Sequence, residues 1–243
     1  ANMMVGRPLI TSFEKGSVES TKNILEIKNV RAKNDRNLIA LKDISLDIKG
    51  GEILGIAGVD GNGQPELAEV LIGMRKTLGG KIILNGKNIT KLSTQAIRNL
   101  GVAYTPEDSM NVGSILEYSG SENLVLDKFR SSRFSKGLFI NQSEIYNYAK
   151  KLVSDFGVRT PSINVPVKQL SGGNLQKIVL ARELFSNPTL ILVHNPTNGL
   201  DVGAIEYIHK TLLENRKQGA AILLISTYLA EIPAMNQHLT VLY

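Results

Sequence analysis

The feature that most constrains the fold is a short apolar run that ends in a glycine-rich segment and leads into a helical pattern. Glu52 to Ala57 is nearly continuous in apolar residues, which is typical of a strand buried on both faces. Gly58-Val59-Asp60-Gly61-Asn62-Gly63 follows, and helical periodicity extends from Pro65 to Ile72. This order surrounds an anion with backbone N–H groups and the positive end of a helix. It predicts a phosphate-binding loop, with a glycine-rich turn that binds no ligand as the alternative.

The rest of the chain alternates between strand-like and helix-like patterns. Apolar and polar residues alternate over 24–30 and 41–48, and Lys81–Leu84 precedes the turn dipeptide Asn85-Gly86. Further strands are expected at 102–104, 190–193, 221–225 and from 239 to 243, and helices at 143–156, 174–185 (amphipathic) and 204–216. The order predicts an α/β fold whose core has parallel strands.

Three segments are distinguished by composition. Residues 1–22 read as a linker or the end of a preceding domain, and 23–243 as one domain. Within it, the stretch from about 108 to 168 is richer in Ser and Asn. We expect an inserted, mainly helical subdomain there, over about 108–175 in all. The chain has no initiator Met and stops within a strand pattern, which suggests a fragment with a truncated C-terminus.

Composition excludes several kinds of chemistry. The chain has no Cys, which excludes thiol catalysis, disulfides and cysteine-based zinc sites, and its three His residues are scattered. Its apolar runs are only as long as strands, and residues 1–7 lack the regions of a signal peptide. The net charge of +6 is compatible with contact to nucleic acid or an anionic membrane, but the basic residues are dispersed. A solvated basic surface is therefore the simpler interpretation.

The glycine loop departs from the phosphate-loop pattern G-x-x-x-x-G-K-[ST] at its last two positions. Gln64 stands at the lysine position, so a positive charge beside the β- and γ-phosphates is lost. Pro65 replaces the Ser or Thr and removes the hydroxyl that would bind Mg²⁺, together with one backbone N–H. Proline is well tolerated in the first helical turn, so the loop is expected to keep its shape.

A second motif carries a resemblance to a known family. Leu170-Ser171-Gly172-Gly173-Asn174-Leu175-Gln176-Lys177 resembles the signature motif of ABC ATPases, in the form found in sugar and nucleoside importers. At a helix start, Ser171 and the N–H groups of Gly172 and Gly173 can bind a γ-phosphate presented by another subunit. A plain helix cap is the alternative. The resemblance implies an ABC-type P-loop NTPase with a RecA-like core, an antiparallel β subdomain and an inserted helical signature subdomain.

The remaining family motifs follow in order, and several of their reactive positions differ. Residues 104–108 resemble the Q-loop segment, 190–197 Walker B, 198–201 the D-loop and 225–229 the switch segment. Asp201 of the D-loop is retained. The four substituted positions are Glu107 at the Q-loop glutamine, His194 at the metal-binding Asp, Asn195 at the water-orienting Glu and Thr227 at the switch His.

Two of these substitutions have alternative interpretations. His194 could serve as a new ligand or base, but it has no carboxylate partner in sequence reach, so a packed or solvated histidine is preferred. Glu107 could replace the missing base, but the family tolerates Glu at this position in sites with a full Walker B motif. We therefore interpret it as a loop residue that contacts metal, water or a partner. General acid–base help is typically worth about 10²–10⁴-fold in rate. We therefore expect poor ATP hydrolysis, or none, by this domain alone.

The resemblance implies one half of a head-to-tail pair in a membrane importer. This half would be the second, because Met4-Val5-Gly6-Arg7 resembles the segment that closes the first half of two-domain importer ATPases. Sequence segments within 159–166 and 199–209 resemble the nucleoside importers more than the monosaccharide importers. The signature would complete the companion domain's ATP site, and Mg²⁺ would bind only there. The implied partners are that domain, a permease and, indirectly, a substrate-binding protein, with no nucleic acid. The implied location is the cytoplasm, at the inner face of the membrane.

Two other function classes stay open at this stage. One is a soluble ABC protein of translation or DNA repair, against which the dispersed charge and the small insertion argue. The other is an interaction module that no longer binds nucleotide. The sequence does not identify a transported molecule.

Overall fold

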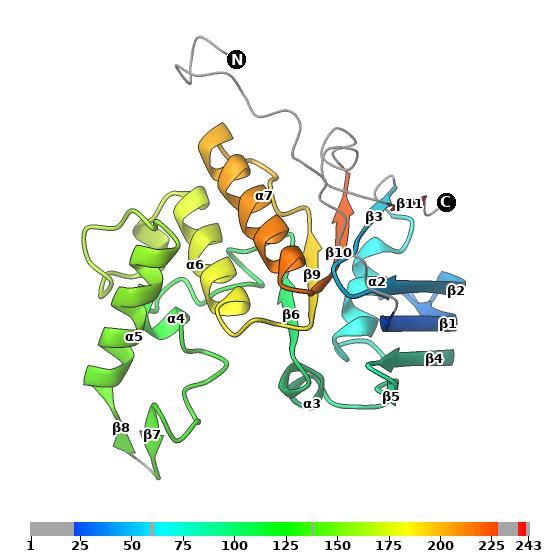
Figure 1. Ribbon diagram of the computed structural model, residues 1–243, viewed down its shortest axis with the longest axis horizontal. Helices are drawn as coiled ribbons and strands as arrows, with labels where there is room; N and C mark the ends of the chain where they lie inside the picture. Colours follow the sequence, from blue (N-terminus) through cyan, green and yellow to red (C-terminus); the bar gives the residue numbers. More distant parts are fainter. Residues whose placement is uncertain (1–21, 59–60, 138, 228–237, 242–243) are drawn as a thin grey trace. The chain divides into compact units, whose positions relative to one another are not determined.

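The computed structural model describes residues 22–58, 61–137, 139–227 and 238–241 (Figure 1). The chain divides into two compact units. The first comprises Ala1–Tyr104, Asn187–Pro196 and Glu206–Tyr243, and the second comprises Thr105–Ser186 and Thr197–Ile205. The interpretation of 1–22 as a linker falls almost entirely outside the described residues.

An antiparallel sheet in the first unit has the strand order β2-β1-β4-β5. Its strands are β1 (Asn23–Lys33), β2 (Ile39–Lys49), β4 (Gly79–Leu84) and β5 (Lys87–Asn88). Asn85 and Gly86 both have positive φ, 48° and 79°, as a tight hairpin turn requires. The predicted antiparallel β subdomain is thereby confirmed.

The second sheet of this unit has the order β11-β3-β10-β9-β6. Its strands are β3 (Ile53–Ala57), β6 (Val102–Thr105), β9 (Leu190–His194), β10 (Ala221–Ser226) and β11 (His238–Val241). β10 runs parallel to both β3 and β9, and β11 runs parallel to β3. Every residue of β3, β9 and β10 is buried, which explains their continuous apolar sequences. The α/β core with parallel strands is confirmed.

Helices α2 (Gln64–Leu71), α3 (Thr94–Asn99) and α7 (Val202–Lys217) accompany these strands (Figure 1). α2 places Leu67 and Leu71 in the core that it shares with the strands of both sheets. The sequence reading did not include α3. Its N-cap Ser93 accepts a hydrogen bond from the Ala96 N–H, but six residues are too few to establish helical periodicity.

The second unit contains helices α4 (Gly120–Asn123), α5 (Gln142–Asp155), the 3₁₀ helix η1 (Val167–Gln169) and α6 (Gly172–Leu184). Phe134, Tyr148, Leu152 and Ile178 belong to its own apolar core. Burial raises the pKa of the Tyr148 hydroxyl to about 12, and the nearby Asp127 carboxylate adds to this. A short hairpin of β7 (Ser135–Lys136) and β8 (Phe139–Ile140), absent from our expectations, interrupts this mainly helical stretch.

The prediction of an amphipathic α6 is wrong, because the helix is not divided into a buried and an exposed face. Every residue from Ile178 to Leu184 is buried. This includes Arg182 and Glu183, which form an ion pair with 2.9 Å between Arg182 Nε and Glu183 Oε1. Arg182 Nη2 also donates to the Gly113 carbonyl oxygen (2.8 Å). Paired polar groups therefore occupy the side where the sequence indicates solvent.

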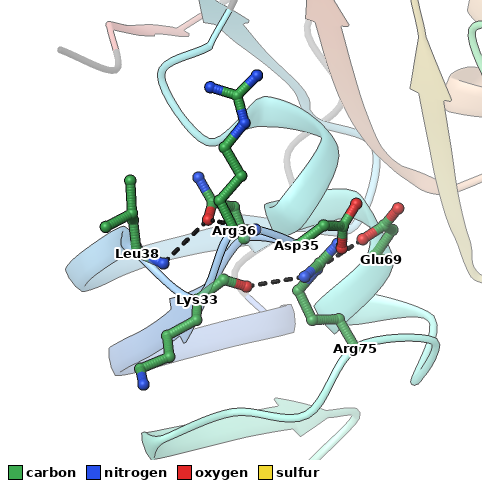
Figure 2. Close-up of polar contacts among 7 residues, drawn as sticks. Lys33, Asp35, Arg36, Leu38, Glu69 and Arg75 are labelled. Atoms are coloured by element: carbon green, nitrogen blue, oxygen red, sulfur yellow. Dashed lines mark hydrogen bonds and ion pairs between the residues drawn. The ribbon is translucent and has the colours of Figure 1, made fainter.

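Figure 2 shows the polar contacts that fix the loop between β1 and β2. Arg75 Nε donates to Glu69 Oε2 (2.6 Å), Nη2 to Asp35 Oδ1 (2.7 Å) and Nη1 to the Lys33 carbonyl oxygen (2.8 Å) (Figure 2). Hydrogen bonding to Asp35 is the main cause of the raised pKa of the Arg75 guanidinium. Asn34 Oδ1 accepts from the Arg36 and Leu38 N–H groups and closes the turn. One cation thus connects the hairpin to α2 and to the segment that follows it.

Within the described ranges, no helix combines the length and the apolar character needed to cross a bilayer.

Substituting Arg75 tests this network. We expect Arg75→Ala to lower the free energy of unfolding by about 1–3 kcal/mol, because Glu69 and the Lys33 carbonyl lose a charged donor. Asp35→Asn is the matched control and should have a smaller effect, because the Asp35 side chain is 91% exposed. Urea unfolding of the two variants provides the comparison, and equal losses would contradict this ranking.

Candidate functional site

The carboxyl ends of three parallel strands meet at one edge of the core sheet. Ala57 pairs with Ser226, and His194 pairs with Ile225. The segments that begin at Gly58, Asn195 and Thr227 therefore start side by side, although they are far apart in the sequence. In open α/β sheets this edge is where ligands bind.

The glycine loop joins β3 to α2 at this edge. Gly61 and Gly63 both have φ of 95°, and Gly63 is the N-cap of α2, with its carbonyl oxygen accepting from the Leu67 N–H (2.9 Å). Pro65 lies in the first turn and is exposed, and Asn62 is half-buried. Gln64 is only 3% exposed, so the side chain at the lysine position is packed within the protein. Asp60 lies outside the described residues.

Gly63 is required by its surroundings as well as by its φ. A Cβ added there would lie 2.8 Å from the Ala40 carbonyl oxygen and 2.9 Å from Leu41 Cδ2. A Cβ added at Gly61 would meet no atom within 4 Å. The start of β2 therefore packs directly against the end of the loop, and this contact holds the first turn of α2 in place.

These two glycines provide a matched pair of substitutions. Gly61→Ala should cost about 1–2 kcal/mol of unfolding free energy through backbone strain alone. Gly63→Ala should cost at least about 1 kcal/mol more, because the added methyl group meets backbone that cannot move away. Urea unfolding of both variants measures the difference. Equal losses would show that β2 yields to the added methyl group.

Asn195 and Thr227 bind each other across the ends of β9 and β10. Asn195 Oδ1 accepts from the Thr227 backbone N–H (2.8 Å) and from the Thr227 hydroxyl (3.3 Å). The Asn195 N–H donates to the Ile225 carbonyl oxygen (2.8 Å), and its φ is 43°. Sequence reasoning treated these residues as separate substitutions. A neutral amide engaged in this way is poorly suited to activate a water molecule.

His194 and Glu107 occupy different environments. His194, the last residue of β9, is 5% exposed, so its side chain is packed and not solvated. In the described part of the chain, no three His, Asp or Glu side chains group so as to hold a metal ion. Glu107 is exposed in the second unit, beside a turn in which the Asn111 N–H, its amide and the Met110 N–H bind Asp108. Those hydrogen bonds lower the pKa of the Asp108 carboxyl group.

In the second unit, the serine–glycine motif begins α6. Ser171 is the N-cap and is exposed, as is Gly172. The Ser171 hydroxyl caps no backbone N–H of the helix; instead it accepts from Asn174 Nδ2 (2.9 Å). Asn174 Oδ1 accepts from the Arg159 N–H (2.7 Å), so this side chain connects the motif to the preceding loop.

Gly173 brings this motif close to Asp201. A Cβ added at Gly173 would lie 3.6 Å from Asp201 Oδ2 and 3.4 Å from Ala204 Cβ. Asp201 Oδ1 accepts from the Ala204 N–H (3.0 Å) at the start of α7. Two motifs that the sequence indicated separately are thus neighbours in the second unit.

Sequence reasoning missed a buried polar side chain in this unit. Asn123 is 0% exposed, accepts from the Ile115 N–H (2.9 Å) and donates to the carbonyl oxygens of Ile115, Tyr118 and Ser119 (3.0–3.2 Å). The Tyr118 carbonyl also accepts from the Val167 N–H of η1 (2.9 Å), just before the signature motif. Ser119 and Glu122 form a capping box, which was the available sequence signal for α4.

Comparison with known proteins adds a family and two relatives. A family model described as "ABC transporter" matches residues 41–198. The guanosine import ATP-binding protein NupO of Bacillus subtilis is 40% identical over 243 residues, which cover 100% of this chain and 48% of that protein. The nucleoside import ATP-binding protein NupA of Lactococcus lactis is also 40% identical, with the same coverage. The chain therefore spans about half the length of these curated relatives.

Solved structures show the same fold. A nucleotide-free ATP-binding cassette from an ABC transporter matches with a TM-score of 0.76 at 22% sequence identity, covering 91% of this chain and 88% of the other. The predicted fold class is therefore confirmed.

Proposed function

Because this chain belongs to the ABC transporter family, we propose that it is an ATP-binding subunit, or half of one, of an importer for nucleosides or simple sugars. The names of the two relatives describe import of guanosine and of nucleosides, and the chain aligns to about half of each. The proposed division is a linker at 1–22 and a nucleotide-binding domain at 23–243, with a helical subdomain at about 108–175. Its place would be the second half of a two-domain protein.

The observation that carries the proposal is the geometry at the start of α6. Ser171 and Gly172 are exposed, and α6 has 13 residues, so its first N–H groups and its positive end are available to an anion. Asn174 orients the Ser171 hydroxyl, and Asp201 lies beside Gly173. We propose that this surface binds the γ-phosphate of an ATP held by the companion domain.

The domain's own site is proposed to be non-hydrolytic. Gln64 is buried, Pro65 has no hydroxyl, and Asn195 is engaged with Thr227. The residues Gly58, Asp60, Gly61, Asn62 and Gly63 would form a cradle that binds nucleotide weakly or not at all, through backbone N–H groups alone. Catalytic Mg²⁺ and the attacking water would belong to the companion domain's site. Productive turnover would then depend on the pair.

The partners follow from this role. We propose a companion nucleotide-binding domain, an integral permease and, indirectly, a substrate-binding protein, with the domain on the cytoplasmic face of the cell membrane. Exposed apolar side chains at Met110, Val112, Ile115 and Tyr118 offer the permease a contact surface in the second unit.

Substrate uptake by the complete importer tests the proposed binding of γ-phosphate at Ser171. We expect Ser171→Arg to abolish substrate uptake, because the larger cation blocks the approach of the γ-phosphate and breaks the contact with Asn174. Ser154→Arg, at an exposed position of α5, is the matched control and should leave uptake unchanged. Normal uptake with Ser171→Arg would contradict the proposed role.

The isolated chain tests the non-hydrolytic site. We expect no Mg²⁺-dependent ATP hydrolysis above background, and weak binding of a fluorescent ATP analogue at most. Robust turnover would refute the proposal. Analogue binding that is absent even with the companion domain would favour an interaction module, and co-purification with ribosomes or DNA would favour a protein of translation or repair.

A further inference from the structure

The β7–β8 hairpin has a base that is firmly attached to α5. Phe134 is 2% exposed, and its ring lies 5.0 Å from that of Tyr148. Arg133 pairs with Glu144 (2.6 Å) and covers the Tyr148 ring at 4.8 Å. The Asn141 N–H donates to the Phe134 carbonyl oxygen (2.8 Å) and closes the base. These contacts attach the base of the hairpin to α5. The hairpin itself extends beyond the first turn of that helix (Figure 1).

The tip of this hairpin exposes large apolar side chains on both of its faces. Phe139 is 82% exposed and Ile140 is 52% exposed. They are consecutive residues of β8, so their side chains point to opposite faces. Phe139 pairs with Lys136, and Ile140 pairs with Ser135. A partner that packed on one face of the hairpin would leave the other apolar side chain in water, whereas a surrounding apolar medium covers both.

The sequence around the tip is rich in cations. Residues 128–143 contain four cationic residues and no Asp or Glu: Lys128, Arg130, Arg133 and Lys136 are the cations. Just outside the two ends of this stretch, Asp127 pairs with Lys128 and Glu144 with Arg133, so Arg130 and Lys136 are the cations proposed to face a ligand. Lys136 is exposed on the tip, and Arg130 lies over the exposed ring of Phe129 (5.4 Å). Apolar side chains flanked by cations are the combination that binds an anionic bilayer surface.

We propose that the β7–β8 hairpin is a contact site for anionic phospholipid, in which Phe139 and Ile140 enter the headgroup region and Lys136 and Arg130 bind lipid phosphate. Nucleic acid fits less well, because Ile140 offers no ring for stacking and the tip lacks the row of cations that follows a phosphate backbone. This site goes beyond the proposed function. It would add a direct membrane contact to one made through a permease.

Vesicle binding by the 243-residue chain provides the test. We expect the chain to sediment with phosphatidylcholine vesicles that contain about 30% phosphatidylglycerol, and much less with phosphatidylcholine alone. Phe139→Ser with Ile140→Ser should reduce binding by about tenfold or more, and Lys136→Glu should weaken it at low salt. The controls at exposed sites of the first unit are Met74→Ser with Leu78→Ser, and Lys87→Glu. Circular dichroism melts confirm that every variant is folded.

Because the chain has no Trp, Phe139→Trp adds a single fluorescent reporter at the tip. Its emission should shift to the blue on anionic vesicles and be quenched by brominated lipid, whereas Leu78→Trp should show neither effect. An unshifted Phe139→Trp emission would overturn the proposal. So would vesicle binding that is equal in the wild type and the double serine variant, or a tip that binds single-stranded RNA or purified permease in preference to vesicles. The hydrolysis and uptake measurements that test the proposed function use none of these readouts. Failure of the lipid-contact proposal can therefore be distinguished from failure of the proposed function.

Discussion

The parallel pairing of β10 with both β3 and β9 is the constraint on which the candidate site depends. All three strands are buried along their whole length, so their register is fixed by apolar packing on both faces. That register places the segments after Ala57, His194 and Ser226 next to one another. Gly63 completes the arrangement, because only a residue without a side chain lets the loop approach Ala40 and turn into α2. The site is thus a consequence of core packing, and its geometry does not require the reactive side chains.

Because core packing sets the geometry of this edge, the edge keeps its form whichever side chains stand at the motif positions. Asn195 accepts two hydrogen bonds from Thr227, so the polar groups at the ends of β9 and β10 satisfy each other. The first turn of α2 accepts Pro65 because the backbone N–H that a proline lacks would have no hydrogen-bond partner within the helix at that position. Each substitution that removes a catalytic group in the proposed function is therefore compatible with a stable fold.

The sequence predicted elements where the apolar pattern was long, and it failed where structure depends on pairs of residues far apart. Periodicity located β1, β2, α5 and α7, and the motifs located the ends of β3 and β9. The two-residue strands β7 and β8 were too short to have a period. The amphipathic prediction for α6 failed because the charged residues Arg182 and Glu183 indicate an exposed face in the sequence, whereas in the structure they pair with each other and are buried. For the same reason the positions of Asn174 and Asn195 could be predicted but their hydrogen-bond partners could not.

The contacts described for Ser171, Gly173 and Asn174 join residues of the second unit. Asn174 connects Ser171 to Arg159, and Asp201 lies beside Gly173. That unit has an apolar core of its own, built around Tyr148, Leu152 and Ile178. Among the described residues, the apolar core that supports α6 includes no residue of the glycine loop. In the proposed function, a change at Gln64 or Pro65 weakens phosphate binding in the first unit while the second unit still presents Ser171. The proposed altered phosphate loop and the proposed signature surface are therefore physically compatible in one chain, and the proposed pair, in which each surface serves a different nucleotide, would make use of both.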